Sequence, residues 1–306
     1  YGVDIIYLTY TQKNTFWPKT VVEILSLLVN DYHFLLLDLP CCRQEEILNI
    51  LNQSDAIHIL TNPIAKHLRS TRKLISDLET RFHFPTNKIK VIVNQSRPGT
   101  IPAAQQQRLL EHDVFAQVPR IPSRASGRIV LEAPESEYAR AVRRISRQEG
   151  DCLVGLALGV GLSYGFCHIG VLKVLEEEHV PIDVIAGSSI GAVIASLWCI
   201  GKTSEQILHI TQEFRQPRTI WNLIDFTFPL LGIIKGDKLY QFLKRHLGAK
   251  TFYDVKIPLK IVASDVKRRE THIFEKGPLI DAIMPTCAMP GVFAPFKLKE
   301  DLLFDG

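Results

Sequence analysis

The sequence lacks the cysteine pattern of a secreted or zinc-binding protein. Its 306 residues include six cysteines, but no C-x-x-C pair, and no group of His and Cys residues has the spacing of zinc ligands. The start of the chain shows neither the charged nor the apolar region of a secretory signal. We therefore expect reduced thiols, a cytosolic protein and no structural zinc.

Long hydrophobic runs and a strong net charge are also missing. The two longest apolar stretches are residues 184–200, which contain a Gly-Ser-Ser-Ile-Gly turn, and residues 221–234, which contain Asp225 and are too short to cross a bilayer. We therefore expect buried core elements instead of membrane spans. A net charge of +4 gives no support to a nucleic-acid partner.

The length allows about two domains, and the pattern shows two α/β halves. Residues 1–120 alternate apolar runs with amphipathic stretches, which predicts a parallel sheet covered by helices. The expected strands are residues 3–8, 33–39, 56–60 and 89–93. Residues 64–81 are expected to be helical, with a buried side formed by Leu68, Leu74, Ile75 and Leu78.

Residues 121–150 are interpreted as a linker followed by a helix with a solvated arginine face, and residues 151–306 as the second half. In this half the expected strands are residues 152–159, 181–187 and 258–265, and the expected helices are residues 170–178 and 190–200. The chain starts at Tyr1 and stops at Gly306, directly after an apolar run, so we expect both halves to be truncated.

The segment Gly187-Ser188-Ser189-Ile190-Gly191 fits the pattern G-x-S-x-G between a predicted strand and a predicted helix. In serine hydrolases this pattern forms a sharp strand-to-helix turn, and its glycines avoid steric clashes. The central serine lies at a helix N-terminus, where free N–H groups favour developing negative charge. This geometry predicts Ser189 as the nucleophile and Ser188 as its neighbour; the alternative is a tight turn in a buried core.

No histidine is placed to serve as the base of a catalytic triad. Downstream of Ser189, His209 and His246 fall in helix-like segments, and His272 falls in a charged, hairpin-like stretch. His168 precedes the serine and begins a helix. We expect a structural role for all four histidines.

A second glycine-rich junction, residues 159–165, reads Gly-Val-Gly-Leu-Ser-Tyr-Gly. One hypothesis is a dinucleotide-binding fingerprint, although its G-x-G-x-x-x-G spacing is one residue too long. The other is an oxyanion loop, whose backbone N–H groups face the oxygen of a tetrahedral intermediate. Further on, LLFDG at residues 302–306 contains the only Asp-Gly pair of the chain, which by itself indicates a turn.

Taken together, these segments resemble the patatin-like phospholipases. That family has a glycine-rich loop opening a helix with HIGVL, then a G-x-S-x-G turn, then a distant Asp-Gly pair. This chain has GLALGVGLSYGFCHIGVLKVLEE, PIDVIAGSSIGAVIASL and LLFDG in that order, and LLGIIKGDKLYQFL, IVASD and GPLIDAIMPTCAMPGVFAPF are similar too. The resemblance covers about residues 152–306 and is nearest to bacterial proteins related to neuropathy target esterase.

The resemblance implies an α/β/α hydrolase fold with a Ser–Asp dyad, in which Asp305 takes the proton of Ser189. The serine would attack an ester of a phospholipid or lysophospholipid, an acyl-enzyme would form, and water would release the fatty acid without a metal or organic cofactor. The oxyanion would be held by the loop amides of Val160, Gly161 and Leu162. The motif glycines are Gly159, Gly165, Gly187, Gly191 and Gly306.

The chain departs from the family in the glycine-rich loop. Val160 and Leu162 replace glycines, and Tyr164 stands where a basic residue is expected. The loop keeps its amide geometry only if neither replacement needs a positive φ. The aromatic-rich residues 221–231 are interpreted either as packed core or as an acyl-chain wall that contacts the bilayer.

The first half resembles the back part of the deviant-Walker ATPases through DYHFLLLDLP, SDAIHILTNP, KVIVNQ and DVFAQVPRIP. By that resemblance Asp38 would help hold Mg²⁺; the alternative is an ordinary acid at a strand end. The phosphate loop G-x-x-x-x-G-K-[ST] is absent. The segment Gly201-Lys202-Thr203 has Ser196 at the required first glycine, and it ends a helix instead of opening one.

We therefore predict a cytoplasmic serine acyl hydrolase, peripheral to the inner face of the membrane, that acts on phospholipids or lysophospholipids. Residues 1–120 would be a regulatory α/β region of ATPase ancestry, through which nucleotides would control activity. The alternative is a nucleotide-regulated switch or scaffold whose hydrolase domain is impaired by the altered loop. A third hypothesis, a dinucleotide-dependent oxidoreductase, leaves the turn at Ser189 without a role.

Overall fold

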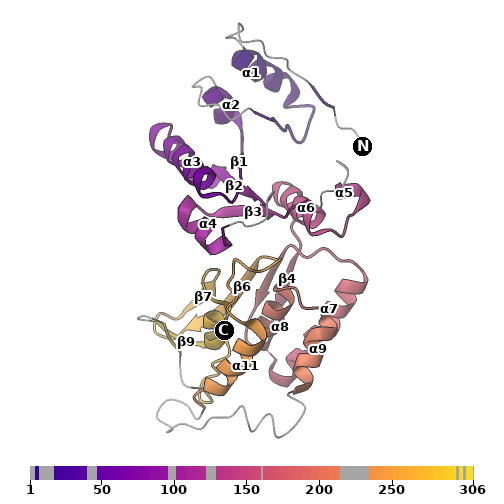
Figure 1. Ribbon diagram of the computed structural model, residues 1–306, viewed down its shortest axis with the longest axis vertical. Helices are drawn as coiled ribbons and strands as arrows, with labels where there is room; N and C mark the ends of the chain where they lie inside the picture. Colours follow the sequence, from indigo (N-terminus) through magenta and orange to yellow (C-terminus); the bar gives the residue numbers. More distant parts are fainter. Residues whose placement is uncertain are drawn as a thin grey trace. The chain divides into compact units, whose positions relative to one another are not determined.

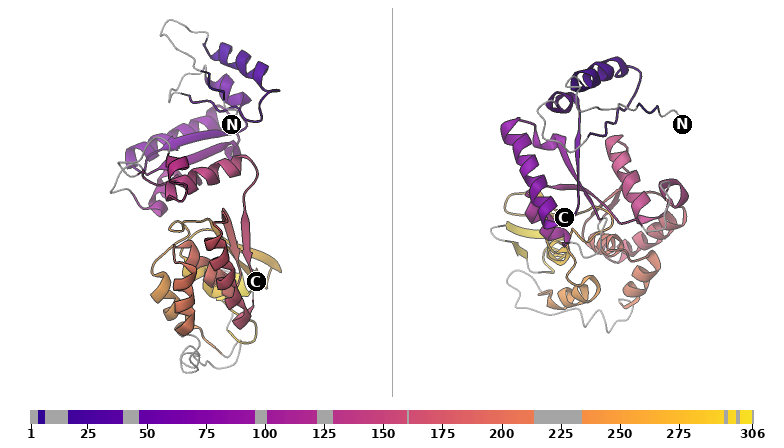
Figure 2. Two further views of the ribbon diagram at one scale, coloured as in Figure 1. Left: turned by 90° about the vertical axis from the view of Figure 1, so that its right-hand side faces the viewer. Right: turned by 45° about the horizontal axis from the view of Figure 1, so that its top comes forward.

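The computed structural model describes residues 4–6, 17–39, 47–95, 101–121, 129–159, 161–213, 234–293, 296–298 and 301–305. The chain divides into two compact units, Tyr1–Ala141 and Val142–Gly306, and each has its own sheet (Figures 1 and 2). The boundary falls inside helix α6, Glu137–Glu149. Both units combine helices with parallel strands, as the sequence predicts for an α/β chain.

The first unit contains a three-stranded parallel sheet in the order β1-β2-β3. Its strands are β1 Ile57–Thr61, β2 Ile89–Asn94 and β3 Val114–Val118. Its helical elements are α1 Trp17–Leu28, α2 Leu48–Gln53, α3 Ala65–Ser76, the π-helix η2 Asp77–Arg81, the 3-10 helix η3 Thr86–Lys88, α4 Ala103–Leu110 and α5 Ile129–Glu132. The strands predicted at 56–60 and 89–93 and the helix at 64–81 are confirmed, and the core includes Leu68, Ile75 and Leu78.

The strands predicted at residues 3–8 and 33–39 are wrong for the part that the structure describes. Residues 4–6 and 33–39 have no strand structure, and the Leu36 side chain is 93% exposed. A strand needs a hydrogen-bonded neighbour as well as an apolar pattern, and among the described residues β1 pairs only with β2. Asp38 therefore lies exposed outside the sheet, and the described residues contain no cluster of metal-ligating side chains.

The second unit contains a mixed sheet in the order β4-β5-β6-β9-β8, with β7 also paired to β6. Strands β4, β5 and β6 are parallel, and β7, β8 and β9 pair in antiparallel fashion. The strands are β4 Gly155–Leu158, β5 Val184–Gly187, β6 Leu259–Asp265, β7 Glu270–Phe274, β8 Phe296–Leu298 and β9 Asp301–Asp305. All three strands predicted in this half are confirmed.

The helices of the second unit cover the middle of the sheet. They are η4 Leu162–Phe166, a 3-10 helix, then α7 Cys167–Glu177, α8 Ile190–Cys199, α9 Ser204–Gln212, α11 Asp237–Leu247 and α12 Leu279–Thr286. Helix α8 packs against β5 and β6, α12 packs against β6 and β9, and α7 lies beside α9 (Figure 1). The two helices predicted in this half are confirmed.

The Gly201-Lys202-Thr203 segment follows the end of a helix, as the sequence predicts, but the expectation that it does not open a helix is wrong, because Thr203 is the N-cap of α9. Gly201 has a φ of 99° just after the end of α8, a conformation that favours glycine at a helix C-terminus. The Thr203 side chain accepts a hydrogen bond from the N–H of Gln206 in a capping box at the start of α9. Within the described residues, no helix is long and apolar enough to span a bilayer.

Candidate active site

Ser189 lies on a sharp turn between β5 and α8. The strand ends at Gly187, Ser188 forms the turn, and Ser189 is the N-cap of α8 with φ 52° and ψ −129°. A positive φ is rare for a residue with a side chain, and it is typical of the strained turn that raises a nucleophilic serine above a sheet. The residue is 8% exposed and stands at the amino end of a ten-residue helix, where backbone N–H groups favour negative charge.

The glycines on both sides of Ser189 are required by close backbone contacts. A Cβ at Gly187 would lie 2.7 Å from the Cα of Ala192, and a Cβ at Gly191 would overlap the carbonyl oxygens of Leu158 and Gly159. Helix α8 therefore starts in direct contact with the end of β4, and any side chain at these two positions would push the strands and the helix apart. This is the steric basis of the G-x-S-x-G pattern in this chain.

The strand register places Asp305, at the end of β9, near the end of β5 that leads into the turn at Ser189. At one end of β6, the carbonyl of Pro258 accepts a hydrogen bond from β5, and at the other end the N–H of Val266 donates one to β9. Residues an even number of positions apart along a strand direct their backbone N–H and C=O groups to the same edge, and these two residues are eight positions apart. Strands β5 and β9 therefore lie along one edge of β6 and point towards each other. Gly187 is opposite Ile261 and Asp305 is opposite Ala263, which places their backbones roughly 7 Å apart.

A gap remains on this edge of β6, between the end of β5 and the end of β9. At the gap, the carbonyl of Val262 accepts a hydrogen bond from the hydroxyl of Thr286, the last residue of α12. The same hydroxyl oxygen accepts the N–H of Ser189 at 2.9 Å. Ser188 is turned into this cluster, with its Oγ 3.2 Å from the Oγ1 of Thr286 and 3.4 Å from the carbonyl of Val262.

The residues after α12 contact the aspartate. The N–H of Asp305 donates a hydrogen bond of 3.0 Å to the carbonyl of Ala288. Burial, together with the negative charge of Asp305, raises the pKa of the Cys287 thiol to about 12. Cys287 therefore stays a neutral thiol at neutral pH and does not compete with a serine nucleophile.

The glycine-rich junction lies between β4 and α7, next to the turn at Ser189. Leu162 begins the 3-10 helix η4, a right-handed element whose residues have negative φ, so its replacement of a glycine leaves the backbone unstrained. Gly165 is required, because a Cβ there would overlap the side chain of Ile190. Gly159 has nothing within 4 Å of an added Cβ, so sterics alone do not demand glycine there.

His168 supports the glycine-rich junction. Its Nε2 donates a hydrogen bond of 3.1 Å to the carbonyl of Gly159, which ties the start of α7 to the end of β4. Tyr164, which stands in place of the family's basic residue, is exposed to solvent. Val160 and Gly306, both expected to be site residues, lie outside the described residues, as do the aromatic residues predicted to wall an acyl-chain site.

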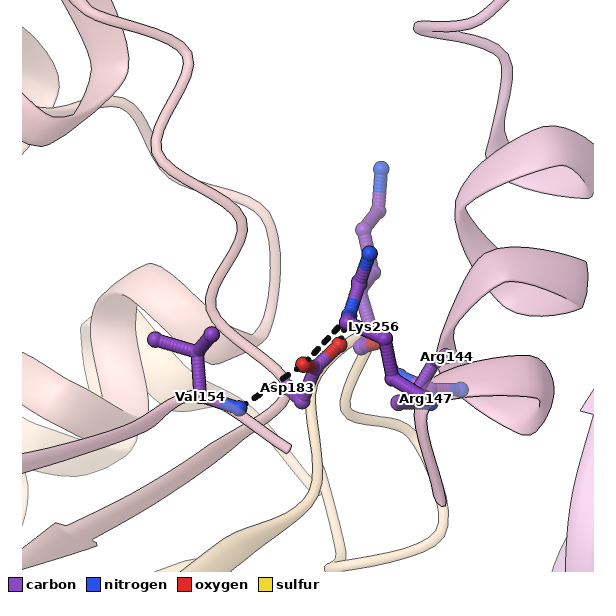
Figure 3. Close-up of polar contacts among 5 residues, drawn as sticks. All are labelled: Arg144, Arg147, Val154, Asp183 and Lys256. Carbon is purple, nitrogen blue, oxygen red and sulfur yellow. Dashed lines mark hydrogen bonds and ion pairs between the residues drawn. The ribbon is translucent and has the colours of Figure 1, made fainter. Parts of the chain in front are cut away.

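The predicted solvated face of α6 is wrong for two of its arginines. The guanidinium of Arg147 donates two hydrogen bonds to the buried carboxylate of Asp183, at 2.7 and 2.5 Å, and this bonding raises the pKa of Arg147 (Figure 3). The N–H of Val154 bonds to the same carboxylate, and Arg144 donates to the carbonyl of Lys256. These contacts join α6 to the amino ends of β4, β5 and β6, at the opposite end of β5 from Ser189.

The hollow on β7 and α12 does not belong to the candidate site. It has a volume of about 400 Å³ and is lined by residues 272–276 with Pro278, Asp281 and Ala282, none of which is a predicted site residue. His272 lies in this hollow, and His246 contacts Phe242 on α11. Neither histidine lies on the edge of β6 along which β5 and β9 pair.

Sequence reasoning missed Thr286 and Ala288. Both fall in GPLIDAIMPTCAMPGVFAPF, which the sequence marks as similar to the family without assigning a role to any of its residues. Thr286 is fully buried, and a buried hydroxyl followed by small residues was the available signal. Its partner Ser189 is 97 positions away, so the contact depends on the fold.

Comparison with known proteins covers mainly the second unit. Residues 156–306 match the family model described as patatin-like phospholipase. An uncharacterized NTE family protein of Mycobacterium tuberculosis is 37% identical over 153 residues, which are 50% of this chain and 42% of that protein. Neuropathy target esterase of Drosophila grimshawi is 26% identical over 285 residues, 87% of this chain and 18% of that protein. The chain thus spans less than half the length of these curated relatives.

Solved structures overlap the chain only in part. VipD from Legionella pneumophila has a TM-score of 0.37 and 13% identity, over 50% of this chain and 46% of that chain. A ParA family ATPase from Chlorobium tepidum has a TM-score of 0.34 and 16% identity, over 41% of this chain and 54% of that chain. Overlap at this level supports no conclusion about function, and the ATPase ancestry of the first unit stays a prediction.

Proposed function

We propose that the patatin-like phospholipase domain formed by residues 156–306 is an active serine hydrolase that cleaves acyl esters of phospholipids or lysophospholipids. Membership of residues 156–306 in this family makes lipid hydrolysis the expected class of reaction. The observation that carries the proposal is that β5 and β9 run towards each other along one edge of β6 and leave a gap between their ends. This arrangement directs Ser189, on a positive-φ turn, and Asp305 to the same gap.

In the proposed reaction, the carboxylate of Asp305 takes the proton of the Ser189 hydroxyl as its oxygen attacks the ester carbonyl carbon. The carbonyl oxygen becomes an oxyanion, which amides of the glycine-rich junction, from Val160 to Leu162, and the amino end of α8 stabilise. The alcohol leaves with the proton from Asp305, and the acyl group remains on Ser189. Asp305 then takes a proton from water, the hydroxide attacks the acyl-enzyme, and the fatty acid leaves as Ser189 regains its proton.

The acid–base role of Asp305 requires a carboxylate that is more basic than one in water. Leu303, two residues before it on β9, is fully buried, and the neighbouring Cys287 thiol is kept neutral by its burial. An apolar surrounding of this kind favours the protonated form of a carboxyl group and so supports proton transfer from a serine. No metal or organic cofactor takes part in the proposed steps.

The substrate class implies a lipid surface as the place of reaction. We propose that the protein is cytoplasmic and peripheral to the inner face of the membrane, and that the first unit regulates the second. Nucleotide control would act through the first unit, in which Asp38 lies exposed outside the sheet.

The experiment measures fatty-acid release from lysophospholipid vesicles by the full-length protein and by Ser189→Ala, Asp305→Asn and Ser188→Ala. We expect losses of at least about a thousandfold for the first two variants, because removal of one member of a nucleophile–base pair disables the whole pair. Ser188→Ala should keep most of the activity. A folded but inert native protein would favour a switch or scaffold, and an active Ser189→Ala variant would refute the assignment of the nucleophile.

A further inference from the structure

The hydroxyl of Thr286 occupies the gap between the ends of β5 and β9. Beyond Gly187 the chain leaves the sheet, so the carbonyl of Val262 has no strand to pair with at this position. Thr286 supplies the missing donor, with its Oγ1 bonded to that carbonyl. The hydroxyl has one hydrogen, so its oxygen is left to act as an acceptor.

The acceptor side of this hydroxyl faces the nucleophile. Ser189 donates its backbone N–H to the Oγ1 of Thr286 at 2.9 Å. Ser189 holds a φ of 52°, a conformation that costs free energy and persists only where surrounding contacts hold it. A hydrogen bond to the backbone of the strained residue itself is such a contact, and Thr286 has no exposed surface through which water could replace it.

The chain directly after Thr286 also holds the base. Two residues later, the carbonyl of Ala288 accepts the N–H of Asp305 at 3.0 Å. Thr286 and Ala288 are buried at the end of α12, which packs against β6 and β9. One short segment, Thr286–Ala288, is therefore bonded at one end to the backbone of Ser189 and at the other to the backbone of Asp305.

We propose that Thr286 is a positioning residue for the serine–aspartate pair, and that the segment Thr286–Ala288 sets the distance between nucleophile and base. The inference rests on the proposed function, because it presumes that Ser189 and Asp305 react together. Thr286 does not touch the substrate. Its hydroxyl fixes the backbone of Ser189, so its loss should slow the chemical step and leave substrate binding unchanged.

The test compares Thr286→Val with Thr286→Ser in the full-length protein. Valine keeps the shape of threonine and removes the hydroxyl, whereas serine keeps the hydroxyl and removes a methyl group. Turnover of a soluble p-nitrophenyl ester gives kcat and KM separately, and a fluorophosphonate probe gives the rate of covalent labelling of Ser189. We expect Thr286→Val to lower kcat and the labelling rate about tenfold, the effect of one hydrogen bond of ordinary strength, with KM nearly unchanged. Thr286→Ser should restore both rates.

A matched control separates positioning from loss of stability. The hydroxyl of Ser204 at the start of α9 is also buried, and it bonds to the carboxylate of Glu176 in the same unit. Ser204→Ala should lower the melting temperature at least as much as Thr286→Val and keep the native kcat. Should Thr286→Val fail to fold, Thr286→Cys, whose sulfur is a weaker acceptor than oxygen, should give a kcat below that of Thr286→Ser, and an equal kcat would refute the positioning role.

The outcomes distinguish this inference from the proposed function. If Ser189→Ala is inactive while folded Thr286→Val labels at the native rate, the positioning role is refuted and the proposed function stands. Equal losses in Thr286→Ser and Thr286→Val would also refute it, because packing of the methyl group would then be the cause. If Ser189→Ala stays active, the proposed function fails, and with it the positioning role, since there is no serine nucleophile to position.

Discussion

The two units respond differently to the same kind of sequence pattern. In the first unit, four apolar runs predict strands, but only the two that find hydrogen-bonded neighbours form them among the described residues. In the second unit, all three predicted strands form, and each lies beside another strand or a tightly packed helix. The difference teaches that an apolar run specifies which residues can become a strand, whereas pairing and close turns decide whether they do.

The turn at Ser189 shows how the second unit enforces its pairing. Gly187 and Gly191 allow the backbones of β4, β5 and α8 to approach until there is no room for a side chain. In the first unit, the side chain of Leu60 on strand β1 is 68% exposed, and the described residues place no strand on the outer edge of β1. Sterically demanding turns therefore make the second unit the more strongly specified of the two.

The largest effect on stability is expected for Gly191→Ala in the second unit. Its Cβ would overlap backbone carbonyls at the end of β4, and neither the strand nor the helix can move away without losing its packing. We therefore expect the free energy of unfolding of the second unit to fall by at least about 3 kcal/mol. Hydrogen exchange should speed up in β4, β5 and β6 and stay unchanged in β1, β2 and β3. Gly170→Ala is the matched control, since nothing lies within 4 Å of its Cβ and alanine favours the helix by about 1 kcal/mol. Normal exchange in Gly191→Ala would contradict the steric account.

The next largest effect is expected for Arg147→Ala. The carboxylate of Asp183 is 1% exposed, so loss of its partner leaves a buried charge and should cost about 3 kcal/mol of unfolding free energy. Arg140→Ala, at an exposed position of the same helix, should stay within about 0.5 kcal/mol of the native protein. Urea unfolding followed by circular dichroism measures both changes. Equal effects of the two variants would restore the interpretation of α6 as a helix with a solvated arginine face.

The smallest effect is expected in the first unit, for Leu36→Ser. A side chain that is 93% exposed loses almost no buried area on substitution, so the change should stay within about 0.5 kcal/mol. Leu68→Ala, at a fully buried position of the same unit, should cost about 3 kcal/mol. Thermal unfolding compares the two. A loss in Leu36→Ser as large as that in Leu68→Ala would mean that residues 33–39 join the core after all, and the contrast between the units would disappear.

Much of the second unit could be predicted from sequence because its signals are local. The G-x-S-x-G pattern, the glycine-rich junction and the apolar runs around them locate the strands and helices to within a few residues, and the family match bears out the resemblance drawn from these segments. The pairing of Asp305 with Ser189 was predicted only from the resemblance to the family. The place of Asp305 opposite Ala263 depends on the register of β9, which no short segment encodes.

Contacts between distant residues account for what the sequence could not reveal. The arginines of α6 follow a spacing typical of a solvated face, yet Asp183, 36 positions after Arg147, binds one of them. The role of Thr286 requires both the end of β5 and the end of β9 to be placed. The strands predicted at residues 3–8 and 33–39 are missing from the described part of the chain for the same reason, because no local pattern states whether a partner strand is present.

Because β5 and β9 lie on the same edge of β6 but far apart in the sequence, Ser189 and Asp305 are synthesised at different times. Ser189 and Asp305 are separated by 116 positions, and a ribosome adds residues at a pace that makes this interval on the order of ten seconds. During that interval the serine turn can form, but the carboxylate that would activate it has not been synthesised. On the proposed mechanism, a nascent chain thus cannot hydrolyse the lipids of the cell until strand β9 has been inserted along β6.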